Sequence, residues 1–469
     1  MRAGLLLSLF LALGCGAGDG LPGCGDGLAL QQVSVVDGLG GPALAEHTVV
    51  VCDGRIVELA PTATARVPRG VKAVDLRGRT VIPGLIDTHA HVTILPVDEA
   101  GRSVSQMHQA DSERTLETLL AFGITSVRNP AGPATEAVAL RDAVETGSIL
   151  GPRMKTAGEA LNHQPNSSGP AAPFAGVADE AAVRAEVERQ AALGVDYIKV
   201  YAALPPELVA SAIEAAHEHG LEVIGHLQRT DWTQAARLGI DFITHGAPWS
   251  AAYLPEATQA GYRGTLRERM SWLEKVDLDG PEIAEMIEQL VAHKVSIDPT
   301  LLVYRTKFFG DDPRHTAHPE IDLAPQTSVE AWRRRTFTDD WSAEDFARGR
   351  QVWPLLLELT RRLHEGGVVL TAGSDLPNPW VIPGVSLHEE LQLLADAGIP
   401  PLEVLRIATY NGAQALGWAG EVGSLEIGKR ADLVVLAADP LRRIANTRAI
   451  EFVLLNGRVL SPAALLAED

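Results

Sequence analysis

Residues 196–225 read DYIKVYAALPPELVASAIEAAHEHGLEVIG and alternate between two kinds of pattern. An apolar run over Tyr197–Tyr201 predicts a strand, a helical pattern covers Pro206–His219, and a second apolar run covers Glu222–Gly225. A strand, a helix and a strand in this order are typical of parallel strands joined by a crossover helix. The stretch therefore predicts one unit of an α/β protein.

The same alternation extends over residues 83–419, where helical patterns such as Glu180–Leu193 and Pro281–His293 separate the apolar runs. Eight runs with helices between them predict a (β/α)8 barrel rather than an open sheet. Two longer segments, Ala247 to about Gly280 and about Leu301 to Asp340, are insertions that we expect at the barrel mouth. The eight runs are Val81–Ile86, Ile124–Arg128, Met154–Ala157, Tyr197–Tyr201, Glu222–Gly225, Phe242–Thr244, Val295–Ile297 and Val368–Thr371.

Short β-rich runs occupy both ends of the chain, in residues 28–82 and 420–469. Asp53-Gly54 and Asn456-Gly457 are hairpin-turn signals between such runs. Neither end is large enough to form a core of its own. We therefore expect one small β-sandwich built from both ends of the chain.

The first residues have the pattern of a targeting segment. Arg2 followed by the apolar run Leu5–Leu13 predicts a signal peptide over residues 1–14. The run ends directly before Cys15, as in bacterial lipoproteins, so we expect a lipidated Cys15 on the periplasmic or outer face of a membrane. An ordinary signal peptide is the alternative. Residues 15–27 are rich in Gly and acidic residues and predict a flexible tether.

Composition limits the kind of protein this is. The 469 residues carry 40 Lys and Arg against 60 Asp and Glu, and the resulting net charge of −20 disfavours a nucleic-acid partner. Three cysteines are too few for a disulfide scaffold in a chain of this length. Cys24 and Cys52 could pair after export, or Cys52 could be a buried free thiol in its apolar strand. No internal apolar run reaches the roughly 18 residues of a membrane span.

Two histidines follow the first apolar run. His89 and His91 stand two positions apart at the end of a strand, where alternate side chains point the same way, and this spacing suits one metal ion. Lys199 lies within the run Tyr197–Tyr201, and alternation points it into the barrel. A buried, unpaired lysine is costly. Lys199 therefore either pairs with an acid or is carboxylated to a carbamate that bridges two metal ions.

Three more ligand-type residues follow later strands. His226 ends the fifth run, His245 ends the sixth, and Asp375 follows the eighth. Each alone is most often structural, as a hydrogen-bonded histidine or as an aspartate in a turn. Together with the two earlier histidines and the strand lysine, they predict a ring of metal ligands on the catalytic face of one barrel.

Across the mature chain these features resemble the metal-dependent amidohydrolase superfamily. Residues 81–91 resemble its opening motif, and Gly423–Leu436 resembles its closing one. Tyr197–Tyr201 resembles the branch with a carboxylated lysine and two metal ions, which includes prolidase-like dipeptidases and carboxypeptidases. Asn129 stands where Asp often follows the Ser-Val-Arg run, and Thr244 stands where Glu is frequent. Neither position is a ligand by this resemblance, so both bear on the choice of substrate.

The resemblance implies a catalytic centre with two divalent ions, and the histidine-rich ligands favour zinc. A hydroxide shared by the ions would attack a polarised carbonyl, with Asp375 acting as base and then as acid. The expected reaction cleaves an amide bond and releases the C-terminal amino acid of a dipeptide or an N-acyl amino acid. The implied ligands are His89, His91 and Asp375 for one ion, His226 and His245 for the other, and carboxylated Lys199 between them.

Two other functions compete with this one. The same centre could hydrolyse a lactone, a cyclic amide or a phosphotriester, because the hydroxide nucleophile is generic. A lipoprotein that only binds a ligand would be expected to have lost some of the ligand positions, and all six are intact.

Substrate contacts are expected at the barrel mouth. His163 follows the third strand and resembles a loop histidine of the dipeptidase-like members, with a surface loop residue as the alternative. Tyr201, Arg128 and Tyr304 are further candidates, and Arg128 could instead form a structural ion pair inside the barrel. The resemblance also favours a homo-oligomer that acts on a small molecule or a dipeptide.

Overall fold

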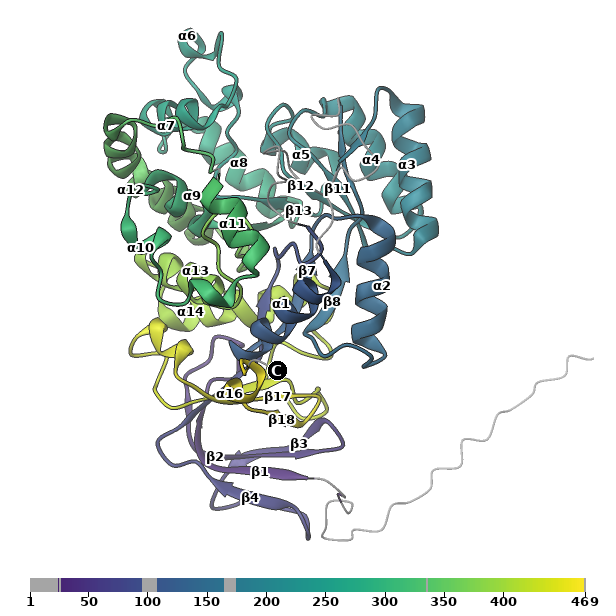
Figure 1. The fold of residues 1–469 in the computed structure, drawn as a ribbon, viewed down its shortest axis with the longest axis vertical. Coiled ribbons are helices and arrows are strands. Elements are labelled where there is room, and N and C mark those ends of the chain that lie inside the picture. The colour runs from purple at the N-terminus through teal and green to yellow at the C-terminus, as the bar shows by residue number, and fades with distance from the viewer. Residues whose placement is uncertain (1–23, 25–26, 95–107, 164–173, 335, 468–469) are drawn as a thin grey trace, which may run out of the picture.

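The computed structural model describes residues 24, 27–94, 108–163, 174–334 and 336–467. The predicted signal peptide, Cys15 and most of the predicted tether lie outside the described residues. Among the helices that are described, none is both long and apolar enough to cross a membrane. The fold consists of a terminal sheet and a larger body of strands and helices (Figure 1).

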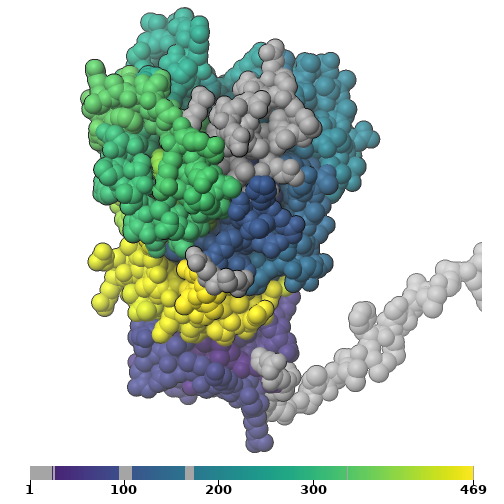
Figure 2. All heavy atoms as spheres, in the orientation of Figure 1, coloured from purple at the N-terminus to yellow at the C-terminus, as the bar shows by residue number. Residues whose placement is uncertain are grey.

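Both ends of the chain contribute strands to the terminal sheet. These strands are β1 (Leu28–Val35), β2 (Leu44–Cys52), β3 (Arg55–Pro61), β4 (Lys72–Asp75), β5 (Thr80–Pro83), β16 (Leu433–Leu436), β17 (Ile450–Leu455) and β18 (Arg458–Leu460). Their order is β18-β17-β16-β5-β1-β2-β3, with β4 beside β1, so the pairing of β5 with β16 joins the two chain ends. Figure 2 shows the yellow C-terminal segment between the purple N-terminal strands and the rest of the molecule.

The first strand of this sheet changes partner along its length. Leu28–Gln31 pairs with β4, whereas Ser34–Val35 pairs with β5, and Gln32 between them has a left-handed φ of 62°. All eight strands thus form one continuous sheet, and its division into the two layers of a sandwich stays a prediction. Both hairpin turns occur where the sequence predicts them, since Asp53-Gly54 and Asn456-Gly457 have positive φ values.

The larger body contains a ring of parallel strands. β6 (Leu85–Asp87), β7 (Ile124–Asn129) and β8 (Arg153–Thr156) form one sheet. The other sheet has the order β10 (Phe174–Gly176), β9 (Ala160–Asn162), β11 (Tyr197–Val200), β12 (Glu222–Gly225), β13 (Phe242–Thr244), β14 (Ser296–Asp298) and β15 (Val369–Leu370). Isolated parallel bridges from Ala157 to Tyr197 and from Ala90 to Leu376 connect the two sheets at both sides. The result is a TIM-barrel-type arrangement, as the alternation of strands and helices predicts.

The first predicted strand is divided between the two parts of the fold. The run Val81–Ile86 contributes β5 to the terminal sheet and β6 to the ring, and the break falls at Gly84. A Cβ atom at Gly84 would lie 2.0 Å from Oγ1 of Thr125 on β7. Only glycine permits this close approach, and the run looks continuous in the sequence because both of its halves are buried.

Helices follow most of the ring strands and cover the outside of the ring (Figure 1), although the described residues place none between β8, β9 and β10. The two predicted insertions are themselves helical, with α6 and α7 after β13 and α9 to α11 after β14. The helices of the first half are α1 (Gln109–Ala121), α2 (Ala134–Glu145), α3 (Glu180–Leu193), α4 (Pro206–Glu218), α5 (Trp232–Leu238), α6 (Glu256–Gln259), α7 (Leu266–Lys275) and α8 (Pro281–Ala292). Those of the second half are α9 (Leu301–Phe308), α10 (Pro313–Thr316), α11 (Gln326–Arg334), α12 (Ala343–Glu365), α13 (Val385–Asp396), α14 (Pro401–Arg406), α15 (Gly412–Ala415) and α16 (Pro462–Leu465).

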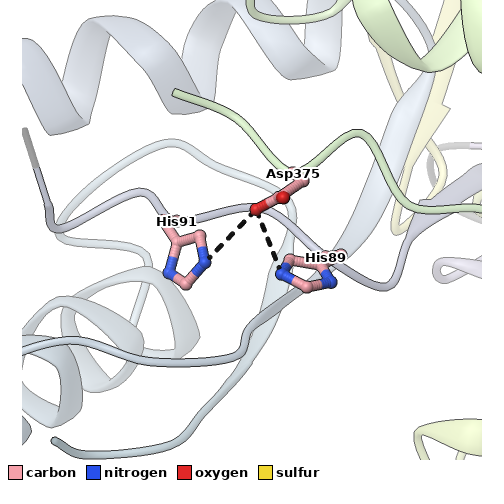
Figure 3. A group of neighbouring side chains, drawn as sticks. All are labelled: His89, His91 and Asp375. Atoms are coloured by element: carbon pink, nitrogen blue, oxygen red, sulfur yellow. Dashed lines mark ion pairs between the residues drawn. The ribbon is translucent and has the colours of Figure 1, made fainter. Parts of the chain in front are cut away.

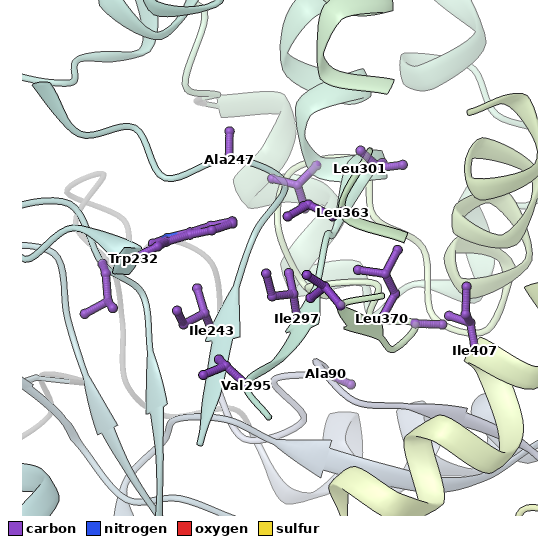
Figure 4. Packing of buried hydrophobic residues seen from close by; sticks show 14 of the residues in the cluster. Ala90, Trp232, Ile243, Ala247, Val295, Ile297, Leu301, Leu363, Leu370 and Ile407 are labelled. Atoms are coloured by element: carbon purple, nitrogen blue, oxygen red, sulfur yellow. The ribbon is translucent and has the colours of Figure 1, made fainter. Parts of the chain in front are cut away.

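The main core lies between the ring strands and the helices. Figure 4 shows Ile243 from β13 and Ile297 from β14 among its fully buried side chains. On β11, Ile198 belongs to this core, whereas Tyr197 packs inside the ring, 5.9 Å from the ring centroid of Phe242. Since side chains alternate along a strand, Lys199 also faces the interior of the ring.

Candidate metal centre

The six predicted metal ligands all line one cavity of about 490 Å³. Lys199 lies on β11, and the other five follow the carboxyl ends of ring strands. Parallel strands of a barrel end on the same side, so residues that are distant in the sequence meet there. Those five are His89 and His91 after β6, His226 after β12, His245 after β13, and Asp375 after β15.

His89, His91 and Asp375 form the tightest group. Nε2 of His89 lies 3.2 Å and Nε2 of His91 lies 3.5 Å from Oδ1 of Asp375. Figure 3 shows both rings directed at the carboxylate. One ligand atom from each of the three residues lies within 4.8 Å of the other two. Two imidazole nitrogens and one carboxylate oxygen at this spacing suit a single divalent ion.

Hydrogen bonds behind the two histidines fix their rings. Nδ1 of His89 lies 2.7 Å from Oδ1 of Asp298, and Nδ1 of His91 lies 3.0 Å from the carbonyl oxygen of Ala131. With the Nδ1 proton held by an acceptor, Nε2 of each ring is the nitrogen left to bind a metal ion. Arg128 donates to the other carboxylate oxygen of Asp298, at 3.1 Å, and does not line the cavity. Arg128 therefore forms a structural ion pair with Asp298 and is not a substrate contact.

His226, His245 and Lys199 form a second group beside the first. Nε2 of His245 lies 2.7 Å from Nδ1 of His226, while Nδ1 of His245 lies 2.8 Å from the hydroxyl of Thr300. Nζ of Lys199 donates to the hydroxyl of Thr244, at 3.3 Å. Within the described part of the chain, no carboxylate forms an ion pair with Lys199. The sequence left open that Lys199 pairs with an acid. The described residues do not support this alternative.

Two members of the cluster have strained backbones. His245 has φ of 80° and Asp375 has φ of 57°, in the left-handed region that non-glycine residues avoid at a cost of about 1–3 kcal/mol each. The backbone N–H of His245 donates to the carbonyl of Asp298, and that of Asp375 donates to the carbonyl of His89, both at 2.7 Å. These bonds hold the two side chains in the cavity despite the strain.

Burial favours the neutral forms of the second group. Burial lowers the pKa of Lys199 to about 7, despite the opposing attraction of Asp298. Burial also lowers the pKa values of His226 and His245 well below the ordinary value of histidine. Neutral imidazole is the form that binds metal ions, so both rings have the protonation state that a ligand needs.

The first group carries charge instead. Burial alone would lower the pKa of His89, but Asp375 and Asp298 outweigh it and raise that pKa to about 9. Burial alone would raise the pKa of Asp375, but His89 and His91 hold it well below its usual range. A divalent ion between these residues would take the place of the proton on His89. The donor set therefore fits a cation such as zinc.

The remaining predicted contacts divide into two kinds. Tyr201 and Tyr304 line the cavity, and the ring of Tyr201 lies 4.4 Å from that of His226. His163 is not among the described residues that line it. Two basic residues of the cavity wall were not predicted from the sequence, Arg269 on α7 and Lys307 on α9. Both lie in the insertions expected at the mouth, and that location was the signal that could have identified them.

The chain belongs to the amidohydrolase family, whose model matches residues 80–460. Members of this family depend on metal ions, in agreement with the His89, His91 and Asp375 group. Among solved structures, a Xaa-Pro dipeptidase with methionine bound in its active site is 18% identical, with a TM-score of 0.68 over 93% of this chain and 100% of that one. The ochratoxinase of A. niger is 19% identical, with a TM-score of 0.68 over 93% of this chain and 96% of that one.

Curated relatives show two kinds of match. The 5-methylthioadenosine/S-adenosylhomocysteine deaminase of Thermoanaerobacter pseudethanolicus is 36% identical over 115 residues, which are 20% of this chain and 26% of that protein. The imidazolonepropionase of Chloroflexus aggregans is 24% identical over 445 residues, which are 90% of each chain. The first four curated relatives match this chain over 26% of their own length or less.

Proposed function

We propose that the protein is a binuclear metal-dependent hydrolase that cleaves an amide bond and releases the C-terminal amino acid of a dipeptide or N-acyl amino acid. The observation that carries this proposal is the convergence of all six ligand-type residues on one cavity. Membership of the amidohydrolase family supports the chemistry, and the structural likeness to a Xaa-Pro dipeptidase supports a dipeptide-like substrate.

In this proposal each group of the cluster holds one ion. The first ion takes Nε2 of His89, Nε2 of His91 and a carboxylate oxygen of Asp375. The second takes Nε2 of His245 and Nδ1 of His226, which hydrogen-bond to each other in the structure. Lys199, once carboxylated by CO2, would supply carbamate oxygens as ligands for both ions, and the lack of an acid partner for it among the described residues supports this role.

The side chains then divide the reaction between them. When bound, the two cations, expected to be zinc, would lower the pKa of a water between them to roughly 7 and would polarise the scissile carbonyl. With the ions in place, Asp375 would accept a proton from the attacking water on a carboxylate oxygen and would deliver it to the departing amine, first as base and then as acid. Asp298 holds the ring of His89 through Nδ1 and so orients its Nε2 toward Asp375.

A small hydrolysis panel tests the reaction. The mature, zinc-loaded protein is assayed with Xaa-Pro and Xaa-Arg dipeptides and N-acyl amino acids, each with a free and an amidated C-terminus, and with a lactone and a phosphotriester. Cleavage of the amides that requires the free carboxylate supports the proposal. If only the lactone or the phosphotriester is hydrolysed, the same centre has the alternative function and does not cleave amides. If no compound of the panel is hydrolysed and the protein binds no metal, a protein that only binds a ligand is favoured.

We further propose that the protein is exported and anchored through a lipidated Cys15. The structure contains a disulfide between Cys24 and Cys52, the pairing that the sequence left open, and such bonds persist in oxidising compartments. The mass of the mature N-terminus tests this, because lipidation adds acyl chains to Cys15 and a plain signal peptide does not. We also propose that the protein forms a homo-oligomer, which light scattering tests. We propose no nucleic-acid partner.

A further inference from the structure

One part of the cavity wall carries two cations for which the described residues provide no acid partner. Arg269 on α7 and Lys307 on α9 both line the cavity and are partly buried. Nε of Arg269 donates to the carbonyl of Gly264, at 3.1 Å, and Nη1 donates to the hydroxyl of Tyr304, at 3.4 Å. Nζ of Lys307 lies 4.6 Å from the ring centroid of Phe337. In the described part of the chain, neither cation forms an ion pair with a carboxylate.

A neighbouring arginine on the same helix, by contrast, does have acid partners. Acidic residues outnumber basic ones by 60 to 40, so carboxylates are abundant. Arg267, two positions before Arg269 on the same helix, pairs with Asp340 at 2.7 Å and with Asp345 at 3.1 Å. Two like charges held together and partly removed from water are costly unless an anion compensates them. Burial and the nearby Arg269 lower the pKa of Lys307 to about 7, which is the expected result of that cost.

A third donor lies between the two cations. The hydroxyl oxygen of Tyr304 accepts hydrogen bonds from Nε1 of Trp249, at 2.8 Å, and from Nη1 of Arg269. Both acceptor sites of a phenol oxygen are then in use, so its own proton is available to donate. No acceptor for that proton is present among the described residues. Tyr304 therefore adds a neutral donor to the positive wall.

We propose that Arg269, Lys307 and Tyr304 form an anion subsite that binds the free α-carboxylate of the substrate. This inference rests on the proposed amide hydrolysis and names the part of the substrate that the cavity recognises. A guanidinium matches the two oxygens of a carboxylate, and a lysine adds a point charge. The subsite and the six ligand-type residues line the same cavity, so a substrate carboxylate can be held while its amide group reaches the metal centre.

Kinetics with matched substrates test the subsite. Arg269→Met and Lys307→Met are compared with the wild type on the best amide substrate of the panel and on its C-terminal amide. Loss of a charge-assisted hydrogen bond should reduce kcat/KM for the free acid by about 10- to 100-fold. The same variants should change kcat/KM for the amide by less than about threefold. Arg267→Met is the control, since it removes a cation from the same helix but not from the cavity.

Binding without turnover separates this inference from the proposed reaction. The probes are N-acetyl-L-leucine, its amide and inorganic phosphate, titrated calorimetrically into the metal-free protein, which should bind them without hydrolysing them. We expect the acid to bind at least about tenfold more tightly than the amide, and Arg269→Met to abolish this preference. Discrimination by binding without any amide hydrolysis would keep the subsite and reject the hydrolase proposal.

Three results would overturn the subsite. The first is equal binding of the acid and the amide, and the second is no binding of the acid up to 10 mM, about the weakest affinity that such contacts give. The third is preference for phosphate over the carboxylate, which would assign the wall to a phosphate-bearing substrate. Amide hydrolysis that is indifferent to the C-terminal carboxylate would reject the subsite and keep the hydrolase.

Discussion

Asp298 holds His89 from behind, with Oδ1 of the aspartate 2.7 Å from Nδ1 of the histidine, while Nε2 of the same ring faces Asp375. The carboxylate of Asp298 is itself fixed by Arg128, at 3.1 Å. All of these side chains are buried. This arrangement fixes the orientation of the His89 ring and keeps a proton on its Nδ1 before any metal ion binds.

Replacing Asp298 should therefore weaken metal binding without touching a ligand. Asp298→Asn keeps the shape of the side chain but loses the charge, and we expect zinc affinity to fall about 10- to 100-fold. Competition with a chromophoric chelator measures the affinity. Asp241→Asn is the matched control, because Asp241 lies 3.0 Å from Nε2 of His217 in a similar pair outside the cavity. Equal affinities for the Asp298 variant and the wild type would contradict the role of Asp298.

Removing Lys199 should remove the bridge between the two ions. We expect Lys199→Ala to lose bound metal and hydrolysis, and a small added carboxylate such as acetate to restore part of both. Elemental analysis and the hydrolysis panel measure the two effects. Lys155→Ala provides the control, since Lys155 lies on the neighbouring ring strand β8 but does not line the cavity. Full activity of Lys199→Ala would exclude the bridging role.

Substrate binding should weaken as the pH rises above about 7. Burial and the nearby Arg269 together lower the pKa of Lys307 to about 7, although the charge of Asp375 opposes this shift. An anionic substrate binds the charged ammonium, so affinity is highest below pH 7 and falls by up to tenfold per pH unit above it. KM measured from pH 6 to 9 on the free acid tests this. Lys307→Met should remove this rise in KM, and an unchanged rise in the variant would assign it to another group.

Glu390 should stabilise the helix that carries Tyr304 and Lys307. Its carboxylate accepts the backbone N–H groups of Leu301 and Leu302, at 2.9 and 2.8 Å, at the start of α9. Glu390→Ala leaves both buried donors without a partner and should cost about 2–4 kcal/mol of unfolding free energy. Urea denaturation measures the loss. Glu389→Ala, which removes only the partly exposed neighbour near His318, should cost much less.

The disulfide should contribute to the stability of the N-terminal strands. Cys24 and Cys52 are 28 positions apart, and a cross-link over a loop of this length typically contributes about 3 kcal/mol. Cys52→Ser should lower the unfolding free energy by that amount, and a reductant should destabilise the wild type equally. A reductant should have no further effect on the variant. Identical stability of the oxidised and reduced wild type would show that the bond contributes nothing.

The sequence by itself determined most of the order of strands and helices and the inward face of the strand that carries Lys199, although it did not predict β9 and β10. The two-residue period over Tyr197–Tyr201 placed Lys199 inside the ring, and the positions of His226, His245 and Asp375 at strand ends placed them at one mouth. The sequence also predicted the hairpin turns at Asp53-Gly54 and Asn456-Gly457. These features follow from local rules, since side-chain alternation, turn geometry and the common direction of parallel strands depend on neighbouring residues.

Only the tertiary structure decided which residues meet across the cavity. The partnership of Asp298 with His89, the assignment of Arg128 to an ion pair, and the division of Val81–Ile86 at Gly84 all depend on segments that are distant in the sequence. Arg269 and Lys307 reach the cavity wall because two inserted segments pack over the mouth. Local periodicity specifies which way a side chain points along its own element. The packing of that element against others determines what the side chain then faces.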